Sequence, residues 1–395
     1  MKTSQLLIVR RLFLIAGSLL ATGQLQAQIS IAGGNLYVFQ TGNGTTAAGS
    51  GTGTPAFIDQ FNTLQGANGG TLNSFLAQTA LPTTPVSAGG NFLSSGHSPQ
   101  NGGLSYNASA NLLVFGGYSG TAVNSSFSAG NRDIGQVNAS GTFSFAVQDS
   151  ARYNGAGGLL RSAITDGSGN YWASGTTPNG GGQGIWYYGT GTPAALIGAA
   201  AATRSLQVYG GNLFYTSGSG VSMITGMPQS GTQTPTLLFA AGSNPYGFSF
   251  SPNMLTAYVA NEAGGIVRAT YSGVFSGGAY SGGSWTTATL DSGTDFDWLT
   301  VDFNSGNPVI YATTLASSTG NRLDEIVDSG TANPAILTLD TITGTSTASG
   351  NYDGIVFVPV PTPEPSVFAL FGFGLVLCVG NWKWMGKRNQ SRRQL

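Results

Sequence analysis

The sequence has 395 residues, of which only 7% are charged and 62 are glycine, whereas charged residues usually make up about 25% of a soluble protein. Residues 28–358 contain no lysine and carry six arginines against 14 acidic residues, which excludes nucleic acid as an expected partner because the phosphate backbone is itself negative. The 11% of aromatic residues can supply a folded core, the alternative being a partly disordered chain rich in Gly, Ser and Thr.

Residues 1–27 have the order of a secretory signal peptide. Basic residues precede an apolar run from Leu12 to Ala21, and small and polar residues then lead to Ala27. The apolar run is short for a membrane span, which takes about 20 residues. We therefore expect export and cleavage by signal peptidase between Ala27 and Gln28.

Between residues 28 and 358 one pattern recurs: a Gly- or Asn-rich turn followed by a short aromatic or β-branched strand. The spacings between its copies are 76, 58, 43, 44 and 52 residues, and three of these lie near the roughly 40–50 residues of a four-stranded propeller blade. The 76-residue interval would hold either a further blade or a long insertion. The copies align on Tyr37, Leu113, Tyr171, Phe214, Tyr258 and Ile310.

A second strand precedes five of these copies, for example "SAITDGS" before "YWAS" and "GFSFSPN" before "AYVA". This strand–turn–strand order indicates β-hairpins. Five hairpins of one kind predict an all-β fold for 28–358, a β-propeller of six or seven blades. A pair of β-sandwiches and a right-handed β-helix are the rival architectures. The segment "AALIGAAAAT" (194–203) is the one helical candidate, and we interpret it as a loop or a single turn.

Residues 245–271 resemble a YVTN-type β-propeller repeat, with Ser251-Pro252-Asn253 in the turn and Tyr258-Val259-Ala260-Asn261 in the strand. The segment "DGIVFVP" (353–359) resembles the closing strand of such propellers. The resemblance implies that this segment lies beside Ile29–Phe39, in one blade or in adjacent blades. Joining the terminal segments would remove two unpaired sheet edges.

Residues that commonly carry catalysis are sparse. His97 stands in a polar loop and Cys378 in the apolar C-terminal segment, and each is the single residue of its type. A hydrolytic site usually needs a histidine base, and a zinc site needs several His or Cys ligands. We therefore expect no catalytic site of either kind.

Carboxylates are concentrated in residues 290–307. Paired acids across a cleft can hydrolyse glycosides, and a polysaccharide hydrolase or lyase would combine them with an arginine such as Arg132 or Arg161. Oxygen ligands also bind calcium, the one cofactor considered, but we favour the interpretation that these residues cap turns between strands. The acids of the segment are Asp291, Asp295, Asp297 and Asp302, and the calcium candidates are Asp302, Asn304, Asp166 and Asn170.

The C-terminal segment has three parts. Residues 359–365 form a Pro-rich spacer, 366–384 an apolar stretch near the length of a membrane-spanning helix, and 385–395 a basic tail. Trp382 and Trp384 stand where an interfacial aromatic belt would lie. The basic tail predicts a cytoplasmic C-terminus.

This tail resembles the PEP-CTERM sorting signal of exopolysaccharide-producing Gram-negative bacteria, in which a PEP motif precedes an apolar helix and a basic end. The resemblance implies recognition and removal of the tail by an exosortase, a membrane protease-transpeptidase. A plain tail anchor is the alternative. The residues that carry the resemblance are Pro363, Glu364, Pro365, Lys387, Arg388, Arg392 and Arg393.

We expect an exported protein that is anchored in the inner membrane during sorting and then reaches the cell-envelope surface or the extracellular matrix. Its body would act as a binding or structural module linked to exopolysaccharide rather than as an enzyme. The alternatives are a secreted propeller enzyme, a polysaccharide lyase or hydrolase, and a purely structural matrix protein rich in Gly, Thr and Asn. A central funnel lined by Asp, Arg and aromatic side chains would favour the enzyme.

Overall fold

The computed structural model describes residues 28–42, 53–63, 75–83, 91–95, 101–120, 130–154, 158–177, 182–198, 202–315, 320–343 and 350–360. Every regular element among these residues is a β-strand, so the predicted all-β class is confirmed. The chain divides into two compact parts, Met1–Val358 and Pro359–Leu395, and all of these strands belong to the first.

The strands form six antiparallel four-stranded units, which we number in ring order. Units 1 and 2 belong to one nine-stranded sheet, in which β4 (Asn91–Ser95) joins them by pairing with both β2 and β6. Unit 1 contains β27 (Asn351–Val358), β1 (Asn35–Thr41), β2 (Gly53–Asn62) and β3 (Phe75–Ala80), and unit 2 contains β5 (Leu104–Asn107), β6 (Leu112–Gly120), β7 (Asn131–Val137) and β8 (Phe143–Asp149).

The other four units are separate sheets. Unit 3 contains β9 (Leu159–Thr165), β10 (Tyr171–Thr176), β11 (Gly184–Tyr188) and β12 (Ala194–Ile197), and unit 4 contains β13 (Thr203–Tyr209), β14 (Asn212–Ser217), β15 (Gly220–Ile224) and β16 (Thr236–Phe239). Unit 5 contains β17 (Pro245–Phe250), β18 (Thr256–Asn261), β19 (Gly265–Tyr271) and β22 (Trp285–Asp291), with the inserted hairpin β20 (Val274–Ser276) and β21 (Ala279–Ser281). Unit 6 contains β23 (Phe296–Asp302), β24 (Val309–Thr314), β25 (Gly320–Val327) and β26 (Ile336–Thr343).

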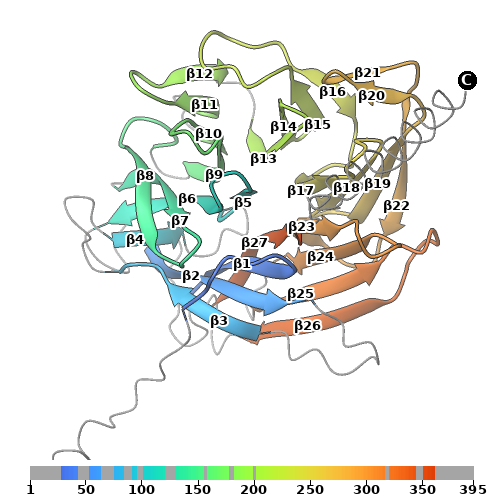
Figure 1. Ribbon diagram of the computed structural model, residues 1–395, viewed down its shortest axis with the longest axis horizontal. Coiled ribbons are helices and arrows are strands. Elements are labelled where there is room, and N and C mark those ends of the chain that lie inside the picture. Colours follow the sequence, from blue (N-terminus) through green and yellow to red (C-terminus); the bar gives the residue numbers. More distant parts are fainter. Residues whose placement is uncertain are drawn as a thin grey trace, which may run out of the picture. The chain divides into compact units, whose positions relative to one another are not determined.

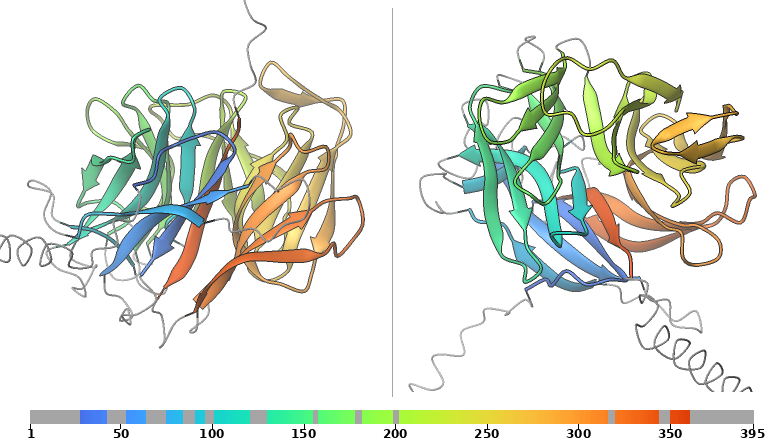
Figure 2. Two further views of the ribbon diagram at one scale, coloured as in Figure 1. Left: turned by 60° about the horizontal axis from the view of Figure 1, so that its bottom comes forward. Right: turned by 45° about the horizontal axis from the view of Figure 1, so that its top comes forward.

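The six units form a propeller-like ring (Figure 1). Each contributes one inner strand, in the order β27, β5, β9, β13, β17 and β23, and each inner strand contacts the next around a closed cycle. The outer strands, such as β8, β22 and β26, lie at the periphery (Figure 1). Figure 2 shows the same sheets from two further directions, standing around the common axis.

The first and last strands of the ring pair with each other. Strand β1 is antiparallel to β27, with Leu36 opposite Phe357 and Tyr37 opposite Val356. The prediction that the two terminal segments are neighbours is therefore confirmed, and they share one unit. Strand β27 supplies the inner strand that unit 1 would otherwise lack, and the pairing removes the unpaired edge of β1.

The hydrophobic core is divided among the six junctions between neighbouring units. Successive residues of a strand point to opposite faces of its sheet, so each strand packs against two neighbours. In β1, Leu36 and Val38 pack toward unit 6, whereas Tyr37 and Phe39 pack toward unit 2. Each of the six hydrophobic clusters of the described residues joins a pair of adjacent units, and the cluster between units 1 and 6 also includes Tyr246 of unit 5. Stability therefore depends on every junction of the ring.

The predicted repeats correspond to one position in each unit. The six alignment residues all lie in the second strand from the axis, namely β1, β6, β10, β14, β18 and β24, and the preceding strands are the inner strands. The 76-residue interval contains β2, β3, β4 and β5 among its described residues, one strand more than the interval from Tyr171 to Phe214, so it includes an insertion between units 1 and 2. The antiparallel pairing contradicts the β-helix alternative.

One local interpretation is wrong. Ala194–Ile197, expected to be a loop or a single turn, is strand β12 and pairs with β11. It is a four-residue outermost strand, too short to show the alternation that marks longer strands. Several further predictions lie outside the described residues: the signal peptide 1–27, His97, the PEP motif, the helix 366–384 with Cys378, and the basic tail 385–395. Within the described part of the chain, no helix meets the length and hydropathy that a membrane span needs.

Candidate functional site

Polar side chains converge where the inner strands begin. Arg161 is the third residue of β9, and the second residues of β13, β17 and β23 are Arg204, Tyr246 and Asp297. These strands occupy the same place in each unit, so their first residues lie on one face of the ring. Glu262, in the turn between β18 and β19, joins them: its carboxyl group hydrogen-bonds with the side chains of Asp297 and Tyr246, and it interacts electrostatically with Arg161 and Arg204. We call these five residues the axial cluster.

The two arginines of the axial cluster share one aromatic ring. The Cζ atom of Arg204 lies 4.4 Å from the ring centroid of Tyr246, and that of Arg161 lies 5.8 Å from it. A guanidinium within about 6 Å of a tyrosine ring is attracted to its negative face. Backbone carbonyls fix both cations: Arg204 Nη1 donates to Pro245 O at 2.8 Å, and Arg161 Nη1 donates to Thr203 O at 3.3 Å.

Two side-chain hydrogen bonds in series connect the guanidinium of Arg204 to the carboxyl group of Glu262. Arg204 Nη2 donates to Asn244 Oδ1, and Asn244 Nδ2 in turn donates to Glu262 Oε2. Glu262 also lies against Asp297, which approaches from β23. Burial raises the pKa of Glu262, and the contacts with Asp297 and the two arginines oppose this shift without cancelling it. The axial cluster thus has two cations and two adjacent carboxyl groups.

The residues of the axial cluster differ in burial. Tyr246, Asp297 and Arg161 are 0%, 1% and 6% exposed, whereas Arg204 and Glu262 are only half-buried. Burial is also the main reason why the pKa of Arg161 is lowered and that of Tyr246 is raised. Arg204 and Glu262 are therefore the groups that a molecule from solvent would meet first.

Trp298 fills the axis beside the cluster. Its ring centroid lies 6.1 Å from that of Tyr246, and the side chain is 3% exposed. It extends from unit 6 as far as Gly103, just before β5 of unit 2, where a Cβ atom would lie 2.6 Å from Trp298 Cη2. Glycine is required there because the ring and the backbone approach so closely.

A groove lies between units 5 and 6, with a volume of about 510 Å³. Most of its lining consists of neutral hydroxyl and amide side chains. Its charged groups form a pair, Arg268 Nη1 and Asp328 Oδ2 at 2.9 Å, and Tyr258 donates to the same carboxylate at 2.6 Å. The polar lining is Ser251, Asn253, Thr256, Thr270, Thr286, Thr287, Asn307 and Ser329, and Phe303 adds an aromatic ring.

The calcium candidates occupy turns, as the turn-capping interpretation expects. Asp302 Oδ1 accepts a hydrogen bond from Asn304 N at 2.8 Å, and its Oδ2 accepts one from Ser305 Oγ at 2.7 Å. Asp166 Oδ1 accepts from Ser168 N, and its Oδ2 accepts from Asn170 Nδ2, both at 2.7 Å. Among the described residues, no three His, Cys, Asp or Glu side chains are grouped as a metal site would need.

The acidic segment 290–307 does not form one site. Asp297 and Asp302 stand at opposite ends of β23, about 16 Å apart in an extended strand. Asp291 Oδ2 instead accepts from Thr294 N in a turn, and the backbone oxygen of Asp295 accepts from Leu315 N. Only Asp297 joins the axial cluster.

Of the two arginines considered for an enzyme, Arg161 joins the axial cluster and Arg132 does not. Arg132 is 1% exposed and donates to the backbone oxygens of Tyr153, Gly130 and Gly158. Its role is to bind loops together between units 2 and 3. Reasoning from the sequence missed Arg204, Tyr246 and Glu262. The sequence does hold a signal for two of them, because Arg204 and Tyr246 stand at the same position, the start of an aligned hairpin.

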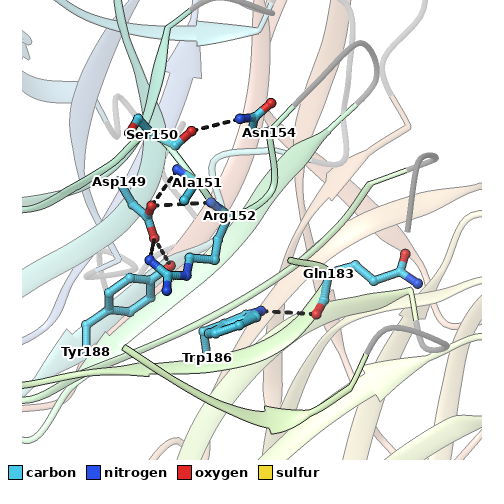
Figure 3. Close-up of polar contacts among 8 residues, drawn as sticks. All are labelled: Asp149, Ser150, Ala151, Arg152, Asn154, Gln183, Trp186 and Tyr188. Carbon is cyan, nitrogen blue, oxygen red and sulfur yellow. Dashed lines mark hydrogen bonds and ion pairs between the residues drawn. The ribbon is translucent and has the colours of Figure 1, made fainter. Parts of the chain in front are cut away.

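Another polar cluster, at the junction of units 2 and 3, is structural (Figure 3). Asp149 accepts hydrogen bonds from Ala151 N at 2.7 Å and Tyr188 Oη at 2.9 Å, and it pairs with Arg152 at 3.4 Å. The Cζ atom of Arg152 lies 4.9 Å from the ring centroid of Trp186. Both Asp149 oxygens have partners within the protein, so this cluster holds two units together.

No family model and no curated protein matches the chain. Many solved structures are similar to it, and three of them serve as examples. A glucose dehydrogenase is 8% identical with a TM-score of 0.40, over 74% of this chain and 95% of that chain. A functionally unknown protein from Desulfotomaculum acetoxidans is 14% identical with a TM-score of 0.43, over 82% and 89%. A protein from Lactobacillus plantarum is 11% identical with a TM-score of 0.38, over 78% and 82%. Similarity at this level carries no argument about this chain, so its function must be argued from its own residues.

Proposed function

We propose that the chain is an exported surface or extracellular-matrix protein whose body, a closed six-bladed β-propeller, binds polysaccharide. Signal peptidase would remove residues 1–27, and an exosortase would recognise the C-terminal signal from Pro363 onward. The groove between units 5 and 6 is the observation that carries the binding function. Its volume of about 510 Å³ falls within the range of about 300–1,000 Å³ for small-molecule sites.

The chemistry of the groove suits a neutral saccharide. Hydroxyl and amide groups can both donate to and accept from sugar hydroxyls. Because Arg268 and Asp328 pair with each other, the groove presents little net charge. The half-buried ring of Phe303 offers an apolar surface for a sugar face. The groove thus combines many hydroxyl and amide groups with one aromatic ring, and this combination supports a saccharide ligand over an apolar one.

Strand β22 supplies a matched pair of variants that tests the groove. Thr287 lines it, whereas Thr289 is exposed on the same strand and does not. Thr287→Val should weaken binding of neutral oligosaccharides about 2- to 10-fold, as expected for one lost hydrogen bond, and Thr289→Val should leave it unchanged. Isothermal titration calorimetry on the full chain measures both. Equal affinities for the two variants, or no binding to any neutral oligosaccharide, would exclude the groove.

The sorting proposal has its own test. Replacing Lys387, Arg388, Arg392 and Arg393 with Asn removes the basic end of the signal. Because a basic end holds the cytoplasmic side of an exported chain, the variant should lose its anchoring or its tail processing. Fractionation and mass spectrometry of the tail report on both. Unchanged localisation and processing would refute the tripartite signal without affecting the groove.

A further inference from the structure

A second pocket lies among the ends of the inner strands of units 2, 3 and 4. Its volume is about 380 Å³, within the range of about 300–1,000 Å³ for small-molecule sites. Asn107 and Thr165 are the last residues of β5 and β9, and Val208 is the next-to-last residue of β13. Strand β9 contacts both β5 and β13 (Figure 1). We call this pocket the strand-end pocket; the axial cluster lies where the inner strands begin.

One carboxylate sets the charge of the strand-end pocket. Asp166, in the turn after β9, is the one charged side chain among the described residues that line it. The six arginines of residues 28–358 are all described, none of them lines the pocket, and this stretch has no lysine. The ion pairs of the described residues use Arg152, Arg268 and Arg322 with other carboxylates. No arginine or lysine of the body therefore neutralises Asp166, and the pocket is negative.

The turn holds the Asp166 carboxylate in place and leaves part of it available. Asp166 Oδ1 accepts hydrogen bonds from Ser168 N at 2.7 Å and Asn170 N at 3.3 Å, and Oδ2 accepts one from Asn170 Nδ2 at 2.7 Å. A carboxylate has about four acceptor sites, so about one remains on Oδ2 for a further donor. The side chain is half-buried, so a donor from solvent can reach it.

The rest of the lining combines an apolar side with amide groups. Ile164, Val208 and Met227 belong to the hydrophobic cluster between units 3 and 4 and line the pocket. Asn107 and Gln207 are half-buried lining residues that carry amide groups. The apolar side suits the C–H face of a sugar ring, and amides donate to and accept from sugar hydroxyls. The carboxylate adds a preference for a positively charged donor, because a hydrogen bond between two charged groups is stronger than a neutral one.

We propose that the strand-end pocket is a second binding site, which takes a protonated amino sugar. Asp166 would accept a hydrogen bond from the ammonium group, and the amide groups of Asn107 and Gln207 would hold the hydroxyls of the sugar. The groove between units 5 and 6 differs because Asp328 is paired there with Arg268. The two sites lie in different units, so either can fail without the other.

Calorimetry on the full chain at pH 6, where a free amino group is protonated, tests the proposal with four ligands. Glucosamine should bind, whereas glucose and N-acetylglucosamine lack the charge and n-butylamine lacks the sugar ring. Each of these three should bind at least about 5-fold more weakly. Asp166→Asn should weaken glucosamine binding about 5- to 20-fold, because a charge-assisted hydrogen bond becomes a neutral one. The comparison of ligands needs no variant, so it tests the proposal independently of the folding of Asp166→Asn.

Asp302→Asn is the matched control. Asp302 caps the turn between the inner and second strands of unit 6, as Asp166 does in unit 3, and it accepts from Asn304 N at 2.8 Å. It does not line the strand-end pocket, so the substitution removes the same charge from the body and should leave glucosamine affinity unchanged. Thr287→Val, which tests the groove, should also leave it unchanged.

Four results would overturn the proposal. N-acetylglucosamine or n-butylamine binding as tightly as glucosamine would show that the pocket does not recognise a charged sugar. Equal effects of Asp166→Asn and Asp302→Asn would remove Asp166 from the site. Weaker glucosamine binding by Thr287→Val would place the amino sugar in the groove instead. The absence of glucosamine binding at millimolar concentrations would exclude the site altogether, while leaving the binding of neutral oligosaccharides in the groove unaffected.

Discussion

Val38 and Ile355 lie directly opposite each other in adjacent antiparallel strands, although they stand near the two ends of the ring-forming chain. Both are buried in the junction between units 1 and 6. Strand β27 also contacts the inner strands of units 2 and 6. One C-terminal strand therefore stabilises three of the six units, and its removal would open the ring.

Truncation after Gly350 should abolish cooperative folding of the body. The deletion removes all of β27 and leaves β1 with an unpaired edge, so most of the roughly 5–15 kcal/mol that stabilises a typical domain would be lost. Thermal denaturation followed by circular dichroism measures this. Truncation after Val360 is the control, because it retains β27, and its melting temperature should equal that of the full body. Identical melting curves for the two truncations would refute closure by β27.

Gly103→Ala should destabilise the body by about 1–3 kcal/mol, the usual cost of overpacking a core. The added methyl group would lie 2.6 Å from both Arg161 O and Trp298 Cη2. Gly198→Ala is a suitable control, because a Cβ atom there meets nothing within 4 Å, and it should change stability by less than about 0.5 kcal/mol. Chemical denaturation gives both values. A stability unchanged by Gly103→Ala would show that Trp298 does not fill the axis.

The body should become less stable as the pH rises from 5 to 8. Burial raises the pKa of Asp59 and of Asp133 to about 7, so between pH 4 and 7 the folded chain holds protons that the unfolded chain has released. Stability falls with pH wherever the folded state binds more protons.

Asp59→Asn provides the test of this pH dependence. The neutral side chain can still accept the hydrogen bond that Gln78 Nε2 donates to Asp59 Oδ1 at 2.7 Å. The variant should be more stable than wild type at pH 8, by about 1–4 kcal/mol, and nearly equal to it at pH 5. Melting temperatures across this pH range decide the matter. A variant with the same pH dependence as wild type would rule out Asp59 as a source.

Export predicts a mature chain that begins at Gln28. Intact-mass spectrometry of the protein from a native envelope fraction should therefore show the loss of residues 1–27. Ala27→Arg should block the cleavage, because signal peptidase requires small residues at the site. A chain that retained Met1 in the envelope would contradict the signal-peptide interpretation.

The inner half of each unit could be predicted from the sequence, but the outer half could not. Inner and second strands carry paired aromatic and β-branched residues because both of their faces are buried, as Tyr258 and Val259 show. Outer strands are exposed and select weakly for such residues: β22 presents Thr286 and Thr287 to solvent. The hairpin β20–β21 is too short to produce a pattern at all.

The candidate site was predictable only in part. Arg161 and Asp297 could be named because charged residues are rare in this chain. Their meeting with Tyr246 and Glu262 could not, because it depends on the order of the units around the ring and on which end of each strand lies on which face. Neither the order of the units nor the face on which each strand end lies can be read from a single sequence.

The use of the last strand as the innermost strand of the first unit has a consequence for the timing of folding. A chain made from its N-terminus onward completes β1 early, but the partner of β1 on the axial side follows more than 300 residues later. Until residue 358 has left the ribosome, no arrangement of the earlier strands can close the ring. The ring therefore cannot close before β27 has been made, and a body still open at that stage would suit the proposed export, in which the chain is threaded through a translocation pore.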